Sequence, residues 1–370
     1  MTRRSLWALE ILAASLLIGI APTTLLAEDP VPIFKVRPES DAGPSAAPVV
    51  SAVNEALCKC NCCIPHCGAI IGGVGLYLIQ PYFETNPAYS VFIQSTGPGE
   101  RVDITHHMDI APLVWLGYIG ENGVGVRGRW WYFRQDTSQT LTFPPGGAEF
   151  TVFGASVMGA QLIVDNPTAY NVTSKLQLQV ADLEMVKNAS VAEWDFLFSG
   201  GIRYADLTQN YNAYAIPDAQ GPLMSGNSYT GIGPVIALEA RYPLCECLSF
   251  YGSVRSALLF GSEIQRAFGI GTQADTSGEA PPGPGTVINA AHHDQVVAAE
   301  ELEVGVEVHA RVNCWTVFGQ VAVIGQEWYG AGNASRSAFS QPPTGAPVFG
   351  TDISSNLGFF GLAVRLGINY

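Results

Sequence analysis

Charged residues, histidines and catalytic signatures are scarce in this chain. Asp, Glu, Lys and Arg make up 14% of its 370 residues, against about 25% in typical soluble domains. The sequence contains no GxSxG, no HExxH and no phosphate-cradling glycine loop, which are common signatures of hydrolases and nucleotide-binding enzymes. We therefore expect a protein that is not an enzyme and has no cofactor. The formal net charge of −14 argues against a nucleic-acid partner, because such partners require a basic surface.

Long apolar runs are also missing after the first 27 residues. A transmembrane helix needs roughly 20 consecutive apolar residues, and no later stretch comes near that length. Yet the mean hydropathy is positive, at +0.19, and 40 residues are glycine. A transmembrane β-barrel combines these features, because its lipid-facing residues alternate with polar ones.

The N-terminal stretch predicts export. Arg3 and Arg4 precede an apolar run over residues 6–20, and Ala27 offers a small residue for cleavage, a pattern typical of a secretory signal peptide. A membrane anchor is the alternative, but the run is short for one. The chain then divides into a signal peptide (1–27), a proline-rich periplasmic linker (28–56), a cysteine-rich segment (57–70) and a β-barrel (71–370).

Residues 356–370 form a strand-like stretch with two different faces. Side chains of a strand point alternately to opposite sides, and one side here is small and polar. In an outer-membrane barrel the apolar side faces lipid and the other side faces the lumen; a soluble edge strand is the alternative for this stretch alone. Bacterial outer-membrane barrels commonly end in this way, so we expect the barrel-assembly machinery to recognise the strand that ends at Tyr370. The apolar stripe consists of Phe360, Leu362, Val364, Leu366, Ile368 and Tyr370.

Between residues 72 and 370 the chain alternates short and long connections between strand-like segments. Short connections such as 120–123 and long ones such as 212–227 are the asymmetry expected of periplasmic turns and outer loops. We predict an all-β fold, a transmembrane antiparallel up-and-down β-barrel of about ten strands. The predicted strands are 72–84, 104–119, 123–136, 174–187, 193–211, 228–242, 248–264, 294–312, 314–328 and 353–370.

Twelve strands are the alternative, because the long connection 137–173 has room for a further hairpin around residues 149–164. The same connection has a second option, which is to fold inward as a plug.

The charged residues of the predicted strands gather on one face. In segment 294–312, Glu301 and Glu303 alternate with Leu302 and Val304. A charge that faces lipid at mid-depth costs about 2–4 kcal/mol, so we place the charged face in the lumen. Two interpretations are open: the charged rows line a water-filled pore that filters solutes, or they pair and fill a narrow interior. The predicted pore-lining residues are Arg127, Arg129, Arg203, Glu239, Arg241, Arg255, Glu301, Glu303, Glu307, Arg311 and Arg365.

Several stretches resemble a known family. They are residues 200–207, 231–241, 248–255, 258–261, 327–335 and 357–362, and together they are similar to the Legionella-type pore-forming outer-membrane proteins, a family also found in planctomycetes. The resemblance covers residues 72–370 approximately. It implies a β-barrel with pore activity and carries no catalytic residues.

Eight cysteines lie on the periplasmic side of the predicted topology. An exported protein permits disulfides, within the chain or to envelope partners. A soft metal such as zinc or Cu(I) on the first five cysteines and His66 is an alternative, although no paired CxxC is present, and unpaired thiols are another. The disulfide candidates are Cys58, Cys60, Cys62, Cys63, Cys67, Cys245, Cys247 and Cys314.

The sequence therefore predicts a protein of the bacterial outer membrane. We expect a porin-like barrel that lets small polar or charged solutes diffuse through a lumen lined by Arg and Glu. The alternative is a structural barrel with a filled lumen, cross-linked to envelope partners through its cysteine-rich segment. Expected partners are outer-membrane lipid, and either further copies of the chain or disulfide-linked envelope proteins.

Overall fold

The computed structural model describes residues 68–93, 100–143, 150–155, 161–216, 221–271, 285–312, 315–335, 339–340, 348–349 and 355–369. The chain divides into two compact units, Met1–Lys59 and Cys60–Tyr370, and all described residues belong to the second. The predicted signal peptide, the linker and most of the cysteine-rich segment therefore lie outside the described residues. No helix in the described part of the chain has the length and apolar character to cross a membrane.

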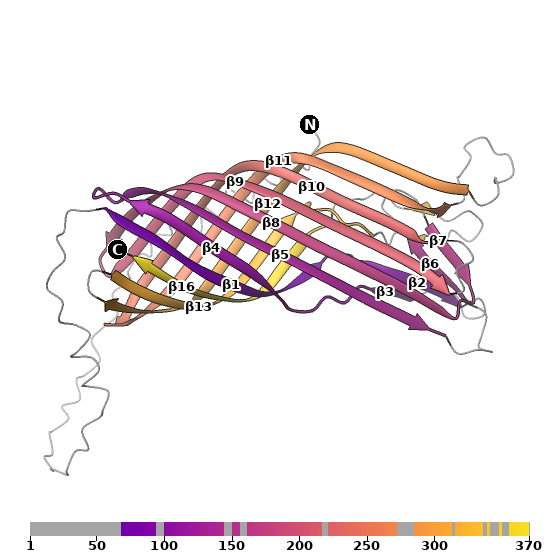
Figure 1. Cartoon of the computed structure of the whole chain (residues 1–370), viewed down its shortest axis with the longest axis horizontal. Coiled ribbons are helices and arrows are strands. Elements are labelled where there is room, and N and C mark those ends of the chain that lie inside the picture. Colours follow the sequence, from indigo (N-terminus) through magenta and orange to yellow (C-terminus); the bar gives the residue numbers. More distant parts are fainter. Residues whose placement is uncertain are drawn as a thin grey trace, which may run out of the picture. The chain divides into compact units, whose positions relative to one another are not determined.

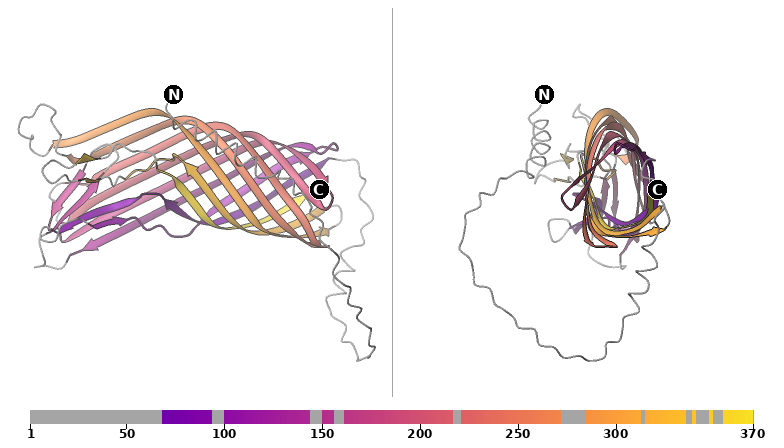
Figure 2. Two further views of the ribbon diagram at one scale, coloured as in Figure 1. Left: turned by 180° about the vertical axis from the view of Figure 1, so that it is seen from behind. Right: turned by 90° about the vertical axis from the view of Figure 1, so that its left-hand side faces the viewer.

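Ten antiparallel strands close into a barrel (Figure 1), which confirms the predicted fold and strand number. Neighbours around the barrel follow the order β1-β16-β13-β12-β11-β10-β9-β8-β5-β4, and β4 pairs again with β1. The right-hand view of Figure 2 shows the closed ring of strands. The strands are β1 (Ala69–Phe83), β4 (Asp109–Ile119), β5 (Val124–Thr142), β8 (Ala169–Val191), β9 (Trp194–Ile216), β10 (Leu223–Cys245), β11 (Leu248–Gly271), β12 (Gly285–Val312), β13 (Trp315–Tyr329) and β16 (Leu357–Asn369).

Each predicted strand corresponds to one strand of the barrel, but several boundaries differ. β12 begins at Gly285 rather than at residue 294, whereas β4 begins at Asp109 rather than at residue 104. Residues 104–108 lie outside the strand ladder, and side chains bond the carbonyls of two of them. Gln80 Nε2 donates to the carbonyl oxygen of His106 at 2.8 Å, and Gln135 Nε2 donates to that of His107.

A second, four-stranded sheet settles the choice between ten and twelve strands. It has the order β3-β2-β6-β7 and is built from β2 (Pro87–Ile93), β3 (Glu100–Asp103), β6 (Phe150–Ala155) and β7 (Gln161–Asp165). A hairpin therefore does form within the long connection 137–173, but it pairs with β2 and adds nothing to the barrel wall. The twelve-stranded alternative is wrong for this reason. Two further short strands, β14 (Phe339–Ser340) and β15 (Val348–Phe349), pair with each other.

The four-stranded sheet packs inside the end of the barrel that carries the long loops, here called the loop end. Val152 and Leu162 of the sheet are buried in one cluster with Tyr170 and Leu223, which point inward from the wall. Tyr211 of β9 donates its hydroxyl to the carbonyl of Ala88 in β2 at 2.5 Å. Of the two options for connection 137–173, the structure therefore shows the inward one.

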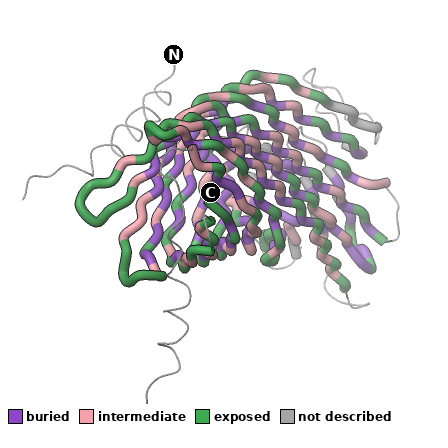
Figure 3. Tube along the Cα trace, turned by 60° about the vertical axis from the view of Figure 1, so that its left-hand side comes forward, coloured by how far each residue is buried: buried purple, intermediate pink, exposed green. Residues whose placement is uncertain are grey.

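The strands alternate between exposed and buried residues along most of the wall (Figure 3). Phe360, Leu362, Leu366 and Ile368 of the predicted apolar stripe are exposed on the outside, whereas Tyr370 lies outside the described residues. The inner face is not lined by charged and small side chains throughout. Around the middle of the barrel it is apolar and bulky, because these side chains form the packed core.

Candidate functional site

Ten of the eleven predicted pore-lining residues lie in the interior, close to the end of the barrel that carries the short turns, here called the turn end. Arg241 is half-buried there, with 26% of its side chain exposed. Arg311 is the exception, because it lies next to the last residue of β12 and is exposed. The nine buried residues are Arg127, Arg129, Arg203, Glu239, Arg255, Glu301, Glu303, Glu307 and Arg365.

Two further acidic residues, Asp182 and Glu184 of β8, belong to the same group and were missed by the sequence reasoning. Both are buried, and in the register of the wall they stand opposite Arg129 and Arg127. The alternation of these two acidic residues with the apolar Leu183 and Met185 was a sequence signal for their inward direction. Leu183 and Met185 are exposed on the outside. With these two, six arginines and six carboxylates form what we call the ionic cluster, whose formal charges cancel.

Asp182 is the acceptor at one side of the ionic cluster. Arg203 donates to it from Nε at 2.7 Å and from Nη2 at 2.9 Å, a bidentate geometry that suits a guanidinium and a carboxylate. Arg129 Nη1 and Arg255 Nη1 reach Asp182 Oδ2 at 3.3 and 3.4 Å. Three guanidinium groups thus share one carboxylate.

Other pairs of the cluster cross the barrel in addition to joining neighbouring strands. Arg127 of β5 donates from Nη2 to Glu184 at 2.8 Å and from Nη1 to Glu239 of β10 at 2.6 Å. Arg129 Nη2 donates to Glu301 of β12 at 2.5 Å. The lumen is narrow enough at this level for side chains from opposite walls to bond directly.

Tyr77 of β1 joins the other side of the cluster. Its hydroxyl accepts from Arg129 and, at 3.0 Å, from Arg365 Nη2, and it donates to Glu303 Oε1 at 3.2 Å. Arg365 also donates to Glu303 and, at 3.1 Å, to the hydroxyl of Tyr251. The cluster is therefore one continuous network of charge-assisted hydrogen bonds.

The network is not fully satisfied. The Nε atoms of Arg255 and Arg365 and Oε2 of Glu303 are buried without a hydrogen-bond partner. Arg255 Nε lies 3.9 Å from Glu301 Oε1, beyond hydrogen-bond distance. An unpaired buried polar group costs about 1–3 kcal/mol, so the cluster is not optimised for stability alone.

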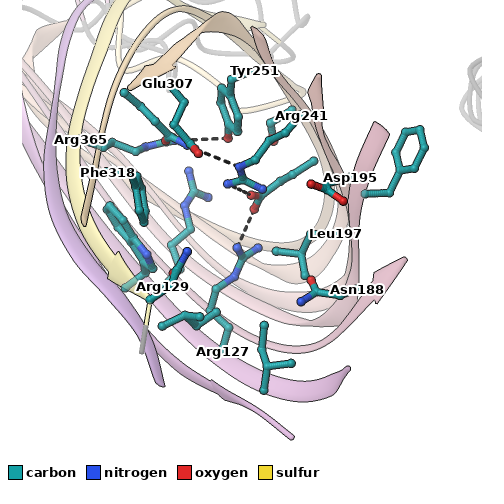
Figure 4. Close-up of a pocket in the computed structure, with 18 of the residues that line it drawn as sticks. Arg127, Arg129, Asn188, Asp195, Leu197, Arg241, Tyr251, Glu307, Phe318 and Arg365 are labelled. Atoms are coloured by element: carbon teal, nitrogen blue, oxygen red, sulfur yellow. Dashed lines mark hydrogen bonds and ion pairs between the residues drawn. The ribbon is translucent and has the colours of Figure 1, made fainter. Parts of the chain in front are cut away.

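A cavity of about 410 Å³ opens onto this cluster from the turn end. Figure 4 shows Arg127, Arg129, Arg241 and Arg365 directed into it. Trp115 and Phe318, whose ring centroids lie 6.4 Å apart, form part of its apolar wall. We call this cavity the vestibule.

On the loop side of the ionic cluster the interior is filled by apolar side chains from all ten strands. Trp131, Phe133 and Phe359 pack edge to face, with Phe133 and Phe359 ring centroids 5.2 Å apart. Every side chain of this apolar layer is at most 3% exposed. Among the described residues, water therefore reaches the ionic cluster from the vestibule and not through this layer.

Above the apolar layer, residues 330–335, which follow β13, enter the lumen; we call them the lumen segment. Ala331 and Ala334 are buried, and positive φ angles of 74° at Gly330 and at Gly332 allow the chain to turn inward there. Gln209 Nε2 of β9 donates to the carbonyl of Gly332 at 3.2 Å, and Ser225 Oγ of β10 donates to that of Ala334 at 2.6 Å. No periodic pattern in the sequence predicts that this segment enters the lumen.

The cysteines and histidines are dispersed in the described part of the chain. Cys245, the last residue of β10, and Cys247, in the turn that follows, are exposed free thiols, and the other six cysteines lie outside the described residues. His293 of β12 pairs with Glu263 at 2.8 Å. Among the described residues, no three His, Cys, Asp or Glu side chains are placed to hold a metal ion.

Comparison with protein families matches residues 70–317 to the Legionella pneumophila major outer membrane protein precursor family. The chain belongs to this family. The protein is accordingly an outer-membrane β-barrel, as its sequence predicted. No curated protein matches the sequence significantly.

Solved outer-membrane barrels are similar to this family member in fold but remote in detail. The outer membrane protease OmpT from Escherichia coli has 10% identity and a TM-score of 0.37, over 82% of this chain and 96% of that one. A deletion mutant of the monoaromatic hydrocarbon channel TodX, a P. putida protein, has 10% identity and a TM-score of 0.27, over 82% and 91%. A Pseudomonas aeruginosa FadL homologue has 7% identity and a TM-score of 0.21, over 82% and 90%.

The lipid-facing band of this family member lies on the turn-end half of the wall. In β12 the outward residues from Leu302 to Val312 are all apolar, and ten residues at about 3.4 Å each, tilted by about 45°, span about 24 Å. That matches an apolar band of about 25 Å. Glu300 and Glu327, opposite each other on the outside, mark its loop-side limit. The ionic cluster therefore lies within the membrane, and the lumen segment lies beyond it.

Proposed function

We propose that this protein is a gated pore for small ions, held closed by its own side chains in the state described above. The observation that carries the proposal is the ionic cluster, six arginines and six carboxylates buried at membrane depth and open to the vestibule. Replacing buried ion pairs by apolar residues of similar volume is often neutral or stabilising. The adjacent apolar layer shows that this barrel can be filled without charges, so filling alone does not account for the cluster.

The arrangement of partners supports a gate rather than a fixed plug. Arg255 lies within 4 Å of three carboxylates, those of Asp182, Glu184 and Glu301. Its Nε has no hydrogen-bond partner, so the guanidinium can exchange partners without losing a complete set of bonds. Movement of such side chains, together with those of the apolar layer, opens a path lined by both signs of charge, which selects ions by size and charge.

The test is single-channel recording of the refolded full chain in planar bilayers. We expect discrete conductance steps. Arg255→Ala removes a positive charge from the path and is expected to increase conductance and shift the preference toward cations. Glu301→Gln is expected to shift it toward anions. Arg134→Ala is the matched control, because Arg134 pairs with Asp136 on the exposed outer surface, and it leaves both properties unchanged.

A silent membrane overturns the proposal if the protein is folded, which is checked by its heat-modifiable mobility in gel electrophoresis. Steps whose ion preference is the same in all three variants overturn the role of the ionic cluster.

A structural barrel is the second candidate, and the closed apolar layer favours it. Under that candidate the protein anchors the envelope through disulfides of Cys58, Cys60, Cys62, Cys63 and Cys67, which lie outside the described residues. It predicts no conductance in any variant. It also predicts high-mass species in cell envelopes that disappear on reduction and when these five cysteines are replaced by serine.

A further inference from the structure

The lumen segment bridges the barrel from wall to wall. On one side it is held by Gln209 and Ser225 of β9 and β10. On the other side Asn333 Nδ2 donates to the carbonyl of Thr85, just after β1. In the order of strands around the barrel, β1 and β10 are five places apart in a ring of ten. The segment therefore crosses the lumen on the loop side of the apolar layer.

Asn86 is the centre of the β1-side attachment. Its Oδ1 accepts hydrogen bonds from Asn333 Nδ2 at 3.4 Å and from Ser335 Oγ at 3.3 Å. Its Nδ2 lies 2.8 Å from His106 Nε2. Because Oδ1 already has two donors, the amide presents N–H to the imidazole, and Nε2 is the acceptor.

The direction of the hydrogen bond at the other ring nitrogen of His106, Nδ1, is also determined. His106 Nδ1 lies 2.7 Å from Gln135 Oε1, and Gln135 Nε2 donates to the carbonyl of His107. That bond requires the Gln135 nitrogen to face the carbonyl, so its oxygen faces Nδ1 and accepts from it. The imidazole is therefore neutral, with its proton on Nδ1, and a second proton has no acceptor.

Within the described part of the chain, no countercharge contacts His106. It packs against Phe83, with ring centroids 5.4 Å apart, and its two side-chain hydrogen-bond partners, Asn86 and Gln135 of β5, are uncharged amides. Arg134 and Asp136, which flank Gln135, are exposed on the outside and pair with each other. Burial is the largest cause that lowers the pKa of His106; the hydrogen bond with Gln135 opposes it, and the described neighbour His107 lowers the pKa further.

We propose that Asn86, His106 and Gln135 form an acid-sensitive latch that holds the lumen segment across the outer half of the lumen as a second gate. Protonation at Nε2 makes two donors, Nε2–H and Asn86 Nδ2–H, face each other with no acceptor between them. Rotation of the Asn86 amide relieves that conflict, but it turns the same Nδ2–H group toward Asn333 and Ser335, which then lose their acceptor. Acid therefore removes the two hydrogen bonds to Asn86 Oδ1 from the β1-side attachment, while the bond from Asn333 to the carbonyl of Thr85 remains. The gating role rests on the proposed pore, whereas the latch itself does not.

Hydrogen exchange of the refolded full chain, read by mass spectrometry on peptides covering the lumen segment, tests the latch without requiring conduction. Protected amides are available there, because Gly332 N–H donates to the carbonyl of Ser355 and Ala334 N–H to Gln209 Oε1, both at 3.1 Å. After correction for the intrinsic pH dependence of exchange, we expect protection to fall at least about tenfold between about pH 7.5 and pH 5.

Two variants and one control define the outcome. His106→Gln has no proton to gain, so the pH response is lost. Gln135→Glu places a carboxylate beside Nδ1, stabilises the imidazolium and moves the release to higher pH. His309→Gln, at the turn end of β12, retains the wild-type response.

A pH response that persists in His106→Gln, or that fails to move in Gln135→Glu, overturns the latch. Conductance recorded on the same preparations separates the two proposals. A conducting barrel with pH-independent exchange overturns the latch alone. A silent barrel with the expected exchange supports the latch and overturns the pore.

Discussion

Arg203 and Asp182 stand opposite each other in β9 and β8 and share two hydrogen bonds, at 2.7 and 2.9 Å. Asp182 also accepts from Arg129 and Arg255, and its side chain has no exposed surface. The pair is therefore an anchor of the ionic cluster within the membrane rather than a local contact of two strands.

Asp182→Asn is expected to destabilise the barrel by about 3–5 kcal/mol, because removing one partner leaves buried arginines without compensation. Asp136→Asn is the matched control. Its ion pair with Arg134 is exposed, and such pairs contribute about 0–1 kcal/mol. Urea unfolding in detergent micelles measures both, and equal losses in the two variants would contradict the anchoring role.

Tyr77→Phe removes the hydroxyl that joins Arg129, Arg365 and Glu303 and leaves the ring in place. Hydrogen bonds to charged groups contribute about 1.5–3 kcal/mol, so we expect a loss of that order. Tyr82→Phe is the control, because Tyr82 is exposed on the outer face. The same unfolding measurement applies, and an unchanged Tyr77→Phe variant would show that the network rearranges at no cost.

Substitution of alanine for glycine is expected to have opposite effects on stability at two positions. A Cβ on Gly361 of β16 would lie 1.9 Å from the carbonyl oxygen of Leu78, whereas a Cβ on Gly325 of β13 meets nothing within 4 Å. Gly361→Ala is therefore expected to cost about 1–3 kcal/mol through overpacking, with Gly325→Ala neutral. Refolding yield and urea unfolding distinguish them, and tolerance of both substitutions would mean that the closure between β1 and β16 is looser than described.

The limits of the lipid band are testable on one strand. Val306 of β12 is exposed near the middle of the outward apolar run, and Glu300 lies at its loop-side limit. Val306→Arg is expected to cost about 2–4 kcal/mol on insertion into lipid, and Glu300→Arg about 0–1 kcal/mol. Folding into liposomes at graded urea concentrations measures the difference. A larger penalty at residue 300 would place the membrane nearer the loop end.

Stability is expected to decrease in acid because of His106. Burial holds its pKa below the ordinary value of 6.5, so below that pH the unfolded chain binds a proton that the folded barrel does not. The free energy of unfolding therefore falls as the pH drops below about 6.5 toward the folded-state pKa. The same measurement on His106→Gln should show a shallower pH dependence, and an identical dependence would exclude this contribution.

The wall of the barrel could be predicted from the sequence. Lipid selects apolar residues at every second position, as at Phe360, Leu362 and Leu366, and the short turns separate the strands clearly. The strand number and the inward direction of the arginines followed from this alternation. The sequence offered a hairpin around residues 149–164 as one alternative, but whether β6 and β7 join the wall depends on pairing with β2, which no local pattern reveals.

What fills the lumen was decided by the tertiary structure. Arg127 and Glu239 are separated by 112 residues, and only closure of the ring brings them to hydrogen-bond distance. The inward apolar side chains of β8, such as Leu178, look in the sequence like one more buried face, and the lumen segment follows no period. The sequence by itself determined which face of each strand meets lipid, because the solvent imposes that choice on each strand independently. Which inward side chains bond across the lumen depends on register and barrel diameter, and these are properties of all ten strands together.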